Sequence, residues 1–202
     1  MFSSIRKHAV HLAMVAAVAV GLSGCGINAV PTQDEQVKAA WSQVLNEYQR
    51  RSDLIPNLVQ TVKGFAAQEK SVLIGVTEAR AKATQMTMSL PADVTSNPEA
   101  FQKFEQTQSQ LGASIGRLLA VSERYPDLKS NENFMALQSQ LEGTENRITV
   151  ARRDYIGAVQ VYNTTLRTIP SRWIAAIFYP DAKVKETFTI SEKAQEAPKV
   201  SF

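Results

Sequence analysis

One spacing constrains the fold of this chain more than any other feature of its 202 residues. Towards the C-terminal end, apolar or aromatic residues recur at every seventh position, at Phe134, Leu141, Ile148, Tyr155, Tyr162 and Ile169. Such a repeat keeps one stripe of a helix turned towards its neighbours. The pattern predicts a single helix over about residues 131–168, which reaches about 57 Å at a rise of about 1.5 Å per residue.

A helix of this length needs partners of similar length, because a compact sphere cannot enclose it. Apolar residues three and four positions apart predict further helices over about residues 34–86 and 98–124. Pro56 interrupts the first of these, which is either a kinked continuous helix or two helices that meet near Ser52. Short connections make neighbouring helices antiparallel. We therefore expect an all-α fold, an elongated antiparallel up-and-down bundle of three to four long helices, over residues 34–179.

Residues 1–24 have the features of a lipoprotein signal peptide. Arg6 and Lys7 precede an uncharged apolar stretch over residues 12–20, which is shorter than the about 20 residues that a spanning helix needs. The sequence Leu-Ser-Gly-Cys that ends at Cys25 resembles the bacterial lipobox. We expect cleavage between Gly24 and Cys25, acylation of Cys25 by chains such as palmitate, and a lipidated tether over residues 25–33. An ordinary signal peptide with a chance cysteine, or an uncut anchor, is the alternative.

The residue after the cysteine bears on localisation. An aspartate there usually retains a lipoprotein in the inner membrane of two-membrane bacteria, and this chain has Gly26. We expect an exported protein that its lipid holds on the outer membrane, facing the periplasm, if the source has two membranes.

The pattern of apolar residues changes after Pro170. A short apolar segment carries Trp173, Phe178 and Tyr179, which could cap the core of the bundle, contact a partner or lie at a membrane surface. We expect the cap. Residues 183–190 alternate weakly, as in an extended segment, and residues 180–202 are expected to form a C-terminal extension that is partly flexible.

The rare residues exclude most catalytic chemistry. Both histidines, His8 and His11, lie in the signal peptide, and Cys25 is the one cysteine. A mature chain without histidine cannot build a Ser-His-Asp triad or the usual histidine and cysteine metal sites. The carboxylate pairs lie beside Arg51, Arg124, Lys129 or Arg147 and are typical of surface ion pairs; they are Glu47 with Asp53, Glu123 with Asp127, and Glu142 with Glu145.

We therefore expect no enzyme activity, no catalytic residue, no cofactor or metal, and no small-molecule substrate. A net charge of +3 is too weak to suggest a nucleic-acid binder. Gly112 and Gly116 have the spacing of a close helix approach inside the bundle. The basic pairs at Arg50 and Arg152 could meet anionic lipid or an acidic partner, but acidic residues nearby favour a structural role.

Four stretches of the chain resemble the LemA family. They are residues 50–70 (RRSDLIPNLVQTVKGFAAQEK), 76–81 (VTEARA), 116–164 and 167–171 (RTIPS). The resemblance covers roughly residues 36–178. Two positions depart from the family: Gln68 stands where a histidine is frequent, and the sequence ends its last apolar segment with Phe178-Tyr179-Pro180 in place of an aromatic-glycine ending.

The resemblance implies an all-α bundle at the cell envelope, with no established enzymatic activity. Members are usually held by an N-terminal transmembrane helix, and here the lipobox replaces it. We expect a non-enzymatic scaffold or protein-interaction module that binds the membrane through the lipid on Cys25 and an envelope protein through its bundle. The alternative is a membrane-organising or membrane-remodelling protein that acts on lipid directly.

Overall fold

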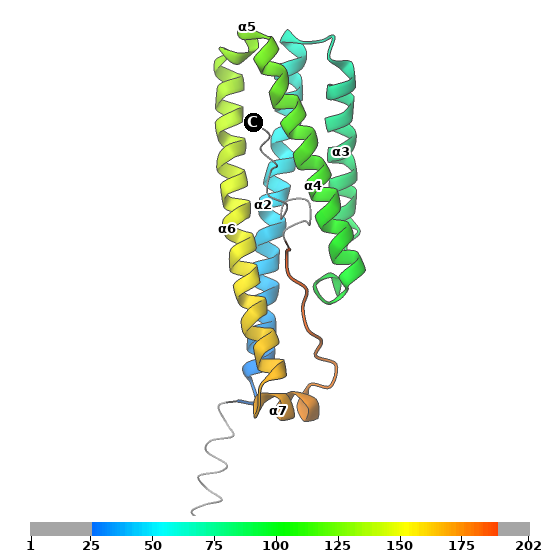
Figure 1. Cartoon of the computed structure of the whole chain (residues 1–202), viewed down its shortest axis with the longest axis vertical. Coiled ribbons are helices and arrows are strands. Elements are labelled where there is room, and N and C mark those ends of the chain that lie inside the picture. Colours follow the sequence, from blue (N-terminus) through cyan, green and yellow to red (C-terminus); the bar gives the residue numbers. More distant parts are fainter. Residues whose placement is uncertain (1–25, 190–202) are drawn as a thin grey trace, which may run out of the picture.

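The computed structural model of the chain describes residues 26–189. Within that range it contains helices and no strand. The four long helices run side by side and alternate in direction (Figure 1); they are α2 (Ala29–Phe65), α3 (Lys70–Met88), α4 (Pro98–Val121) and α6 (Glu132–Arg167). Short elements join or follow them: the 3₁₀ turns η1 (Val94–Ser96) and η2 (Ser122–Arg124), and the helices α5 (Pro126–Lys129) and α7 (Ser171–Phe178). The predicted all-α, elongated bundle is confirmed.

The heptad stripe forms the buried face of α6. Asn131 caps the helix by accepting a hydrogen bond from the Phe134 amide at 3.0 Å, which satisfies one of the donors left free in the first turn. The stripe is buried from Phe134 to Tyr162, and α6 reaches about 54 Å. Ile169 lies beyond the end of the helix and is exposed. The seven-residue repeat therefore continues past the last residue of α6.

The first predicted helix is two helices, and the break is not near Ser52. α2 continues through Pro56 and ends at Phe65, and α3 begins at Lys70 after a reversal of the chain. Pro56 has no N–H to offer the carbonyl of Ser52 one turn earlier. The guanidinium Nε of Arg80, on α3, donates to that carbonyl at 2.9 Å. A neighbouring helix thus supplies the donor that the proline removes.

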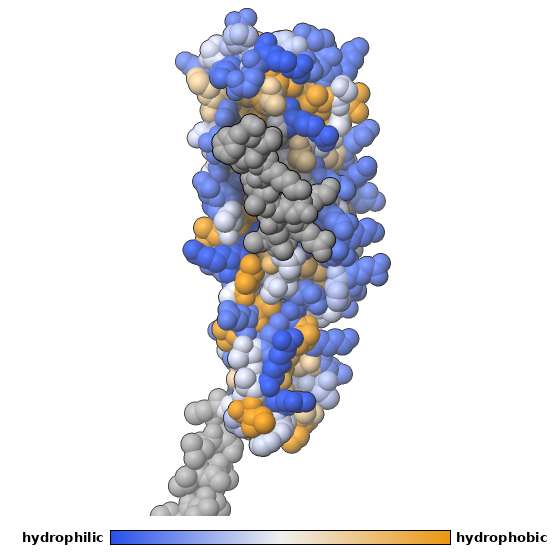
Figure 2. Space-filling view, in the orientation of Figure 1, coloured by the Kyte–Doolittle hydropathy of each residue, from blue (hydrophilic) through white to orange (hydrophobic). Residues whose placement is uncertain are grey.

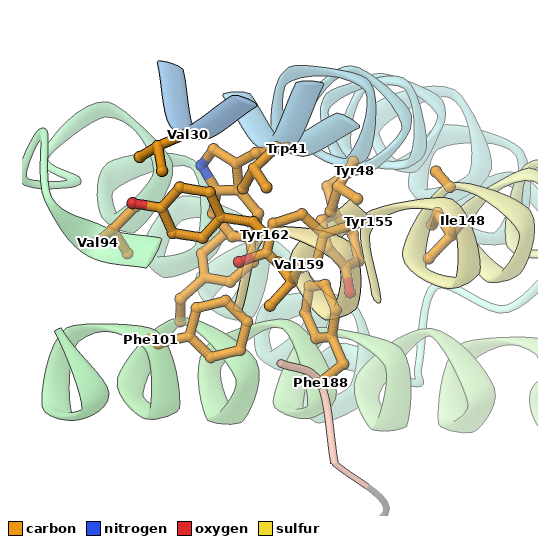
Figure 3. Packing of buried hydrophobic residues seen from close by; sticks show 14 of the residues in the cluster. Val30, Trp41, Tyr48, Val94, Phe101, Ile148, Tyr155, Val159, Tyr162 and Phe188 are labelled. Carbon is orange, nitrogen blue, oxygen red and sulfur yellow. The ribbon is translucent and has the colours of Figure 1, made fainter. Parts of the chain in front are cut away.

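Two hydrophobic clusters fill the bundle. The one near the α2–α3 turn is aliphatic for the most part, around Leu58, Leu111 and Leu118. The other, towards α7, is rich in aromatic rings (Figure 3). There Trp41 lies 5.6 Å from the ring of Phe101 and 5.3 Å from that of Tyr155, measured between centroids.

The C-terminal strap, residues 180–189, closes the aromatic cluster. Phe188 is only 7% exposed, and its ring centroid lies 5.0 Å from that of Phe101 and 5.6 Å from that of Tyr155. The Tyr155 hydroxyl donates to the carbonyl of Glu186 at 2.8 Å. Burial raises the pKa of the Tyr155 phenol above its ordinary value, with a smaller contribution from the charge of Glu186. The strap is extended, as expected for residues 183–190, but no strand partner pairs with it among the described residues.

Polar contacts fix the strap along its length. The Asn163 side chain accepts from the Lys185 amide at 2.8 Å and donates to the Lys185 carbonyl at 2.9 Å. The Glu186 amide donates to the Thr95 carbonyl at 2.7 Å. The ammonium of Lys185 forms an ion pair with Asp34 at 3.0 Å. The strap therefore joins α2, α6 and the loop before α4.

Two predicted boundaries are corrected by these contacts. The tether expected over residues 25–33 is helical from Ala29, and Val30 is buried in the aromatic cluster. The extension expected over residues 180–202 packs on the bundle as far as Thr189, because Phe188 has a site in the core. The signal peptide, Cys25 and residues 190–202 lie outside the described residues.

Candidate functional site

The end of the bundle at which α2 begins is crossed by α7 (Figure 1). Ala175 is the buried residue of this short helix. Three of its large apolar side chains face solvent: Trp173 is 60% exposed, Ile177 73% and Phe178 56%. The expectation that Trp173 and Phe178 cap the core is wrong. This helix of two turns packs on the bundle through the face that carries Ala175, and Trp173 and Phe178 lie on its exposed faces. Tyr179 is half-buried against the aromatic cluster and does contribute to closing it.

The beginning of the described chain lies directly against α7. A Cβ atom added to Gly26 would come within 3.2 Å of Cδ1 of Ile174. Cys25, the predicted lipid attachment site, is the residue before Gly26. Whatever is attached to Cys25 is therefore attached next to α7.

Charges of both signs lie near this end of the bundle. Residues 163–180 contain two arginines, Arg167 and Arg172, and the exposed Asp181 follows them. Both arginines are exposed. The end thus combines apolar side chains with hydrophilic ones (Figure 2).

A polar groove runs along the flank between α4 and α6, beyond the end of the strap. It has a volume of about 1150 Å³, and Tyr48 and Arg51 of α2 form its floor. Its walls are mostly polar and include Gln102, Gln106, Glu145 and Arg152. Burial raises the pKa of Glu105, which also lines the groove, although the backbone of Thr189 and the charge of Arg152 oppose that rise.

Arg51 joins three helices beneath this groove. Its side chain is only 5% exposed, and Nη1 contacts Glu145 of α6 at 3.1 Å. Nη2 donates to the side chain of Gln108 on α4 at 2.7 Å and to its carbonyl at 3.2 Å. The guanidinium also lies 4.9 Å from the ring centroid of Tyr48. A buried charge is tolerated only with such partners, so Arg51 has a structural role, as expected for the basic pairs.

The two glycines of the GxxxG spacing do not mediate a close helix approach. A Cβ atom at Gly112 would lie 3.8 Å from Nη1 of Arg51, which is an ordinary contact, and one at Gly116 would meet nothing within 4 Å. The helix that carries them faces the groove at Gly112 rather than a neighbouring backbone.

Five of the six carboxylates that the sequence places in pairs form ion pairs or accept hydrogen bonds from glutamine side chains. Glu47 binds Arg147 at 3.1 Å, and Glu145 binds Arg51. Glu123 binds Lys129 at 2.7 Å. Asp53 and Glu142 accept from glutamine side chains one turn away. Within residues 26–189 no three carboxylates come close enough together to hold a metal ion.

The opposite end of the bundle has a polar cluster around Glu69. The Tyr125 hydroxyl donates to Glu69 at 3.0 Å and accepts from Gln68 at 2.8 Å. Arg124 pairs with Glu69 at 3.1 Å. These contacts tie the α2–α3 turn to the connection before α6. Gln68, which stands where a histidine is frequent in the family, thus has a structural partner in Tyr125.

The match to a known family covers most of these features. The LemA family pattern matches residues 40–202. The chain belongs to the LemA family. That range includes the aliphatic cluster, most of the aromatic cluster, the polar groove, α7 and the strap. Most of the architecture described above therefore belongs to this LemA protein's family domain.

Curated relatives of this LemA protein are magnetosome proteins. Magnetosome protein MamQ 2 of Paramagnetospirillum magneticum is 28% identical over 182 residues, which is 82% of this chain and 65% of that protein. Magnetosome protein MamQ of Magnetospirillum gryphiswaldense is 24% identical over 164 residues, or 74% of this chain and 60% of that protein. The chain thus spans less than two thirds of the length of these relatives.

No helix within residues 26–189 is both long enough and apolar enough to cross a bilayer. Sequence reasoning found the α7 segment, which includes Ile177, but missed Ile169 as part of the exposed surface. Ile177 lies four residues after Trp173, and that spacing puts the two on one helix face. The polar groove left no signal in the sequence, because its walls come from three helices that are distant along the chain.

Proposed function

We propose that this LemA protein is a lipid-anchored, non-enzymatic scaffold of the cell envelope that binds a protein partner in its polar groove. The observation that carries the proposal is the strap. At the end of the groove nearest α7, the bundle already holds an extended polypeptide through side-chain contacts to its main chain, such as those of Asn163 with Lys185. The groove continues beyond Thr189 with further polar side chains. Its shape and lining suit an extended segment of a partner protein.

The anchor that we propose is the lipid on Cys25. It would hold the α7 end of the bundle at the membrane, since Gly26 contacts α7. The names of the magnetosome relatives support a role at a membrane. We place the protein on the outer membrane, facing the periplasm, in a two-membrane source. Partner binding rather than catalysis is favoured because most of the carboxylates described above bind basic or amide side chains.

The groove is tested by site-specific photo-crosslinking in cells. A photoreactive amino acid replaces Gln106, an exposed residue that lines the groove. The matched control replaces Gln85, an exposed glutamine on α3 that does not line it. We expect one protein to be captured in stoichiometric amount from position 106 and not from position 85. Equal capture from both positions would remove the groove from the proposal.

The anchor is tested separately with Cys25→Ala. This variant should no longer take up a palmitate analogue and should no longer be processed by the lipoprotein peptidase. Labelling and cleavage that persist at the same place would show that Cys25 is not the anchor.

A second function, direct organisation of the membrane by the protein, is favoured by the exposed apolar side chains of α7. It differs from the scaffold in one measurable outcome. Acylated protein alone would deform vesicles, whereas a scaffold would leave their shape unchanged in the absence of its partner.

A further inference from the structure

Large apolar side chains gather at the α7 end of the bundle. Trp173, Ile177 and Phe178 are more than half exposed, and so is Ile169 just before the helix. Single exposed apolar residues are common on soluble proteins, but a contiguous group is the usual mark of an interaction surface. Nothing in the described part of the chain covers this group.

The position of the chain's beginning identifies what covers it. Gly26 contacts Ile174, so the predicted lipid on Cys25 leaves the protein within a residue of α7. A lipid attached there brings the bilayer to the exposed side chains, because one residue of chain reaches only about 3.8 Å. A protein partner on the same surface would have to compete with that bilayer.

The charge at this end fits a bilayer as well. Arg167 and Arg172 are exposed beside the apolar group, and one exposed carboxylate, that of Asp181, lies three residues after Phe178, so the basic side chains outnumber the acidic one here. Apolar residues flanked by basic ones are typical of helices that lie in the headgroup region of a membrane. Each basic residue near an anionic surface contributes attraction to it. The direction of α7, across the end of the bundle, is the one that such a helix needs when the bundle stands on the membrane (Figure 1).

We infer that α7 is a second membrane contact: it lies flat in the headgroup region, with Trp173, Ile177 and Phe178 at the acyl-chain boundary and Arg172 at the phosphates. The inference rests on the lipid anchor of the proposed function and adds orientation to it. A lipid alone restrains one point and leaves the bundle free to tilt. A lipid together with α7 restrains a surface, holds the long axis away from the bilayer and presents the polar groove at a fixed height.

The chain carries its own probe for this contact. It has two tryptophans; Trp41 is buried in the aromatic cluster, and Trp173 is exposed on α7. Acylated full-length protein is reconstituted into vesicles of neutral and anionic phospholipids, with or without bromine atoms on the upper acyl chains. The difference in emission between the wild type and Trp173→Phe reports Trp173 alone. We expect this difference spectrum to shift to the blue in vesicles and to lose most of its intensity with brominated lipid.

The matched control moves the probe to the other end of the bundle. Ile74, near the start of α3, is 56% exposed, close to the 60% of Trp173, and α2 separates the two ends by about 55 Å. In the double variant Trp173→Phe, Ile74→Trp, the new tryptophan should show neither the blue shift nor the loss of emission. Helix content measured by circular dichroism checks that each variant is folded.

Each outcome separates the anchor from the contact. If Cys25 is acylated and the protein stays on the vesicles, but Trp173 emits as in water, the inference is overturned and the anchor stands. A blue shift without quenching by brominated lipid also overturns it, since another protein surface would then cover α7. If Cys25 carries no lipid, the proposed function fails, and the inference that rests on it fails too.

Discussion

Replacement of Phe188 by alanine measures how much the strap contributes to the fold. Phe188 lies ten residues after the end of α7, in a long irregular segment of the described chain. Its ring fills the space between Trp41, Phe101 and Tyr155, at 6.0, 5.0 and 5.6 Å between centroids. The guanidinium of Arg152 covers the ring from outside at 4.3 Å.

The size of the effect follows from that environment. Truncation of a buried phenylalanine to alanine costs about 3–5 kcal/mol when the surroundings cannot collapse into the cavity. Phe188 is 7% exposed, so it is nearly as buried as such residues. The strap belongs to a chain end, however, and can lift away once its aromatic contact is lost, which limits the cost to what its docking contributes. We expect a decrease of about 3 kcal/mol in the free energy of unfolding.

The assay is unfolding in urea, followed by circular dichroism, with two matched variants. Phe188→Leu keeps most of the volume and should cost less than about 1.5 kcal/mol. Val184→Ala removes methyl groups from a strap residue that is 39% exposed and should stay within about 0.5 kcal/mol of the wild type. A second readout is the pKa of Tyr155, which should fall towards the ordinary value of 10.0 in Phe188→Ala as burial is lost. If Phe188→Ala is as stable as Val184→Ala, the strap does not dock, and the reasoning is refuted.

Two further predictions concern the helices themselves. Ile148→Asp should unfold the bundle, because it buries an unpaired carboxylate in the stripe of α6; a variant with wild-type helix content at neutral pH would contradict this. Asp34 should stabilise the fold in a pH-dependent way: burial raises its pKa, but the hydrogen bonds and charges of Lys38 and Lys185 outweigh burial and lower the pKa below 3.8. That stabilisation is complete above 3.8 and is lost as the pH falls through the lower pKa of the folded state. The difference in unfolding free energy between the wild type and Asp34→Asn should therefore be largest at neutral pH and shrink in acid, and a difference that grows in acid would contradict the assignment.

The seven-residue repeat predicted α6 well because a long helix in a bundle buries the same face at every second turn. Phe134 to Tyr162 each meet the same kind of neighbour, so the period survives local variation. The repeat did not mark the end of the helix. Ile169 keeps the spacing by chance in the segment before Pro170, and a hydrophobic period cannot distinguish a buried isoleucine from an exposed one.

The break between α2 and α3 was misplaced because local signals compete with tertiary contacts. Pro56 is the strongest helix breaker in the region, and the sequence cannot show that Arg80, 28 residues from Ser52, donates to the free carbonyl. The reversal at residues 66–69 carries no proline, and Ala66 there is fully buried. It depends on Tyr125 and Arg124, which bind Glu69 from another part of the chain.

The candidate surfaces also show which features a local sequence pattern predicts and which depend on tertiary contacts. The aromatic residues of α7 were found from the sequence, but their role as a cap was not correct, because which face of a two-turn helix is buried depends on where the bundle ends. The groove depends on the separation of α4 from α6, which no local pattern records. The ion pairs were anticipated as a class, yet the partners of Glu145 and Glu47 come from positions about a hundred residues away.

The order of the last elements connects the two surfaces. α7 is followed directly by the strap, and the strap ends where the polar groove begins, with Phe188 and Thr189 in its lining. Ten residues therefore link the apolar end of the bundle to the groove. They are not helical, and contacts with Asn163 and with the aromatic cluster hold them in place. The aromatic cluster thus does more than fill the α7 half of the bundle: it fixes the position of one end of the groove relative to the end that we propose faces the membrane.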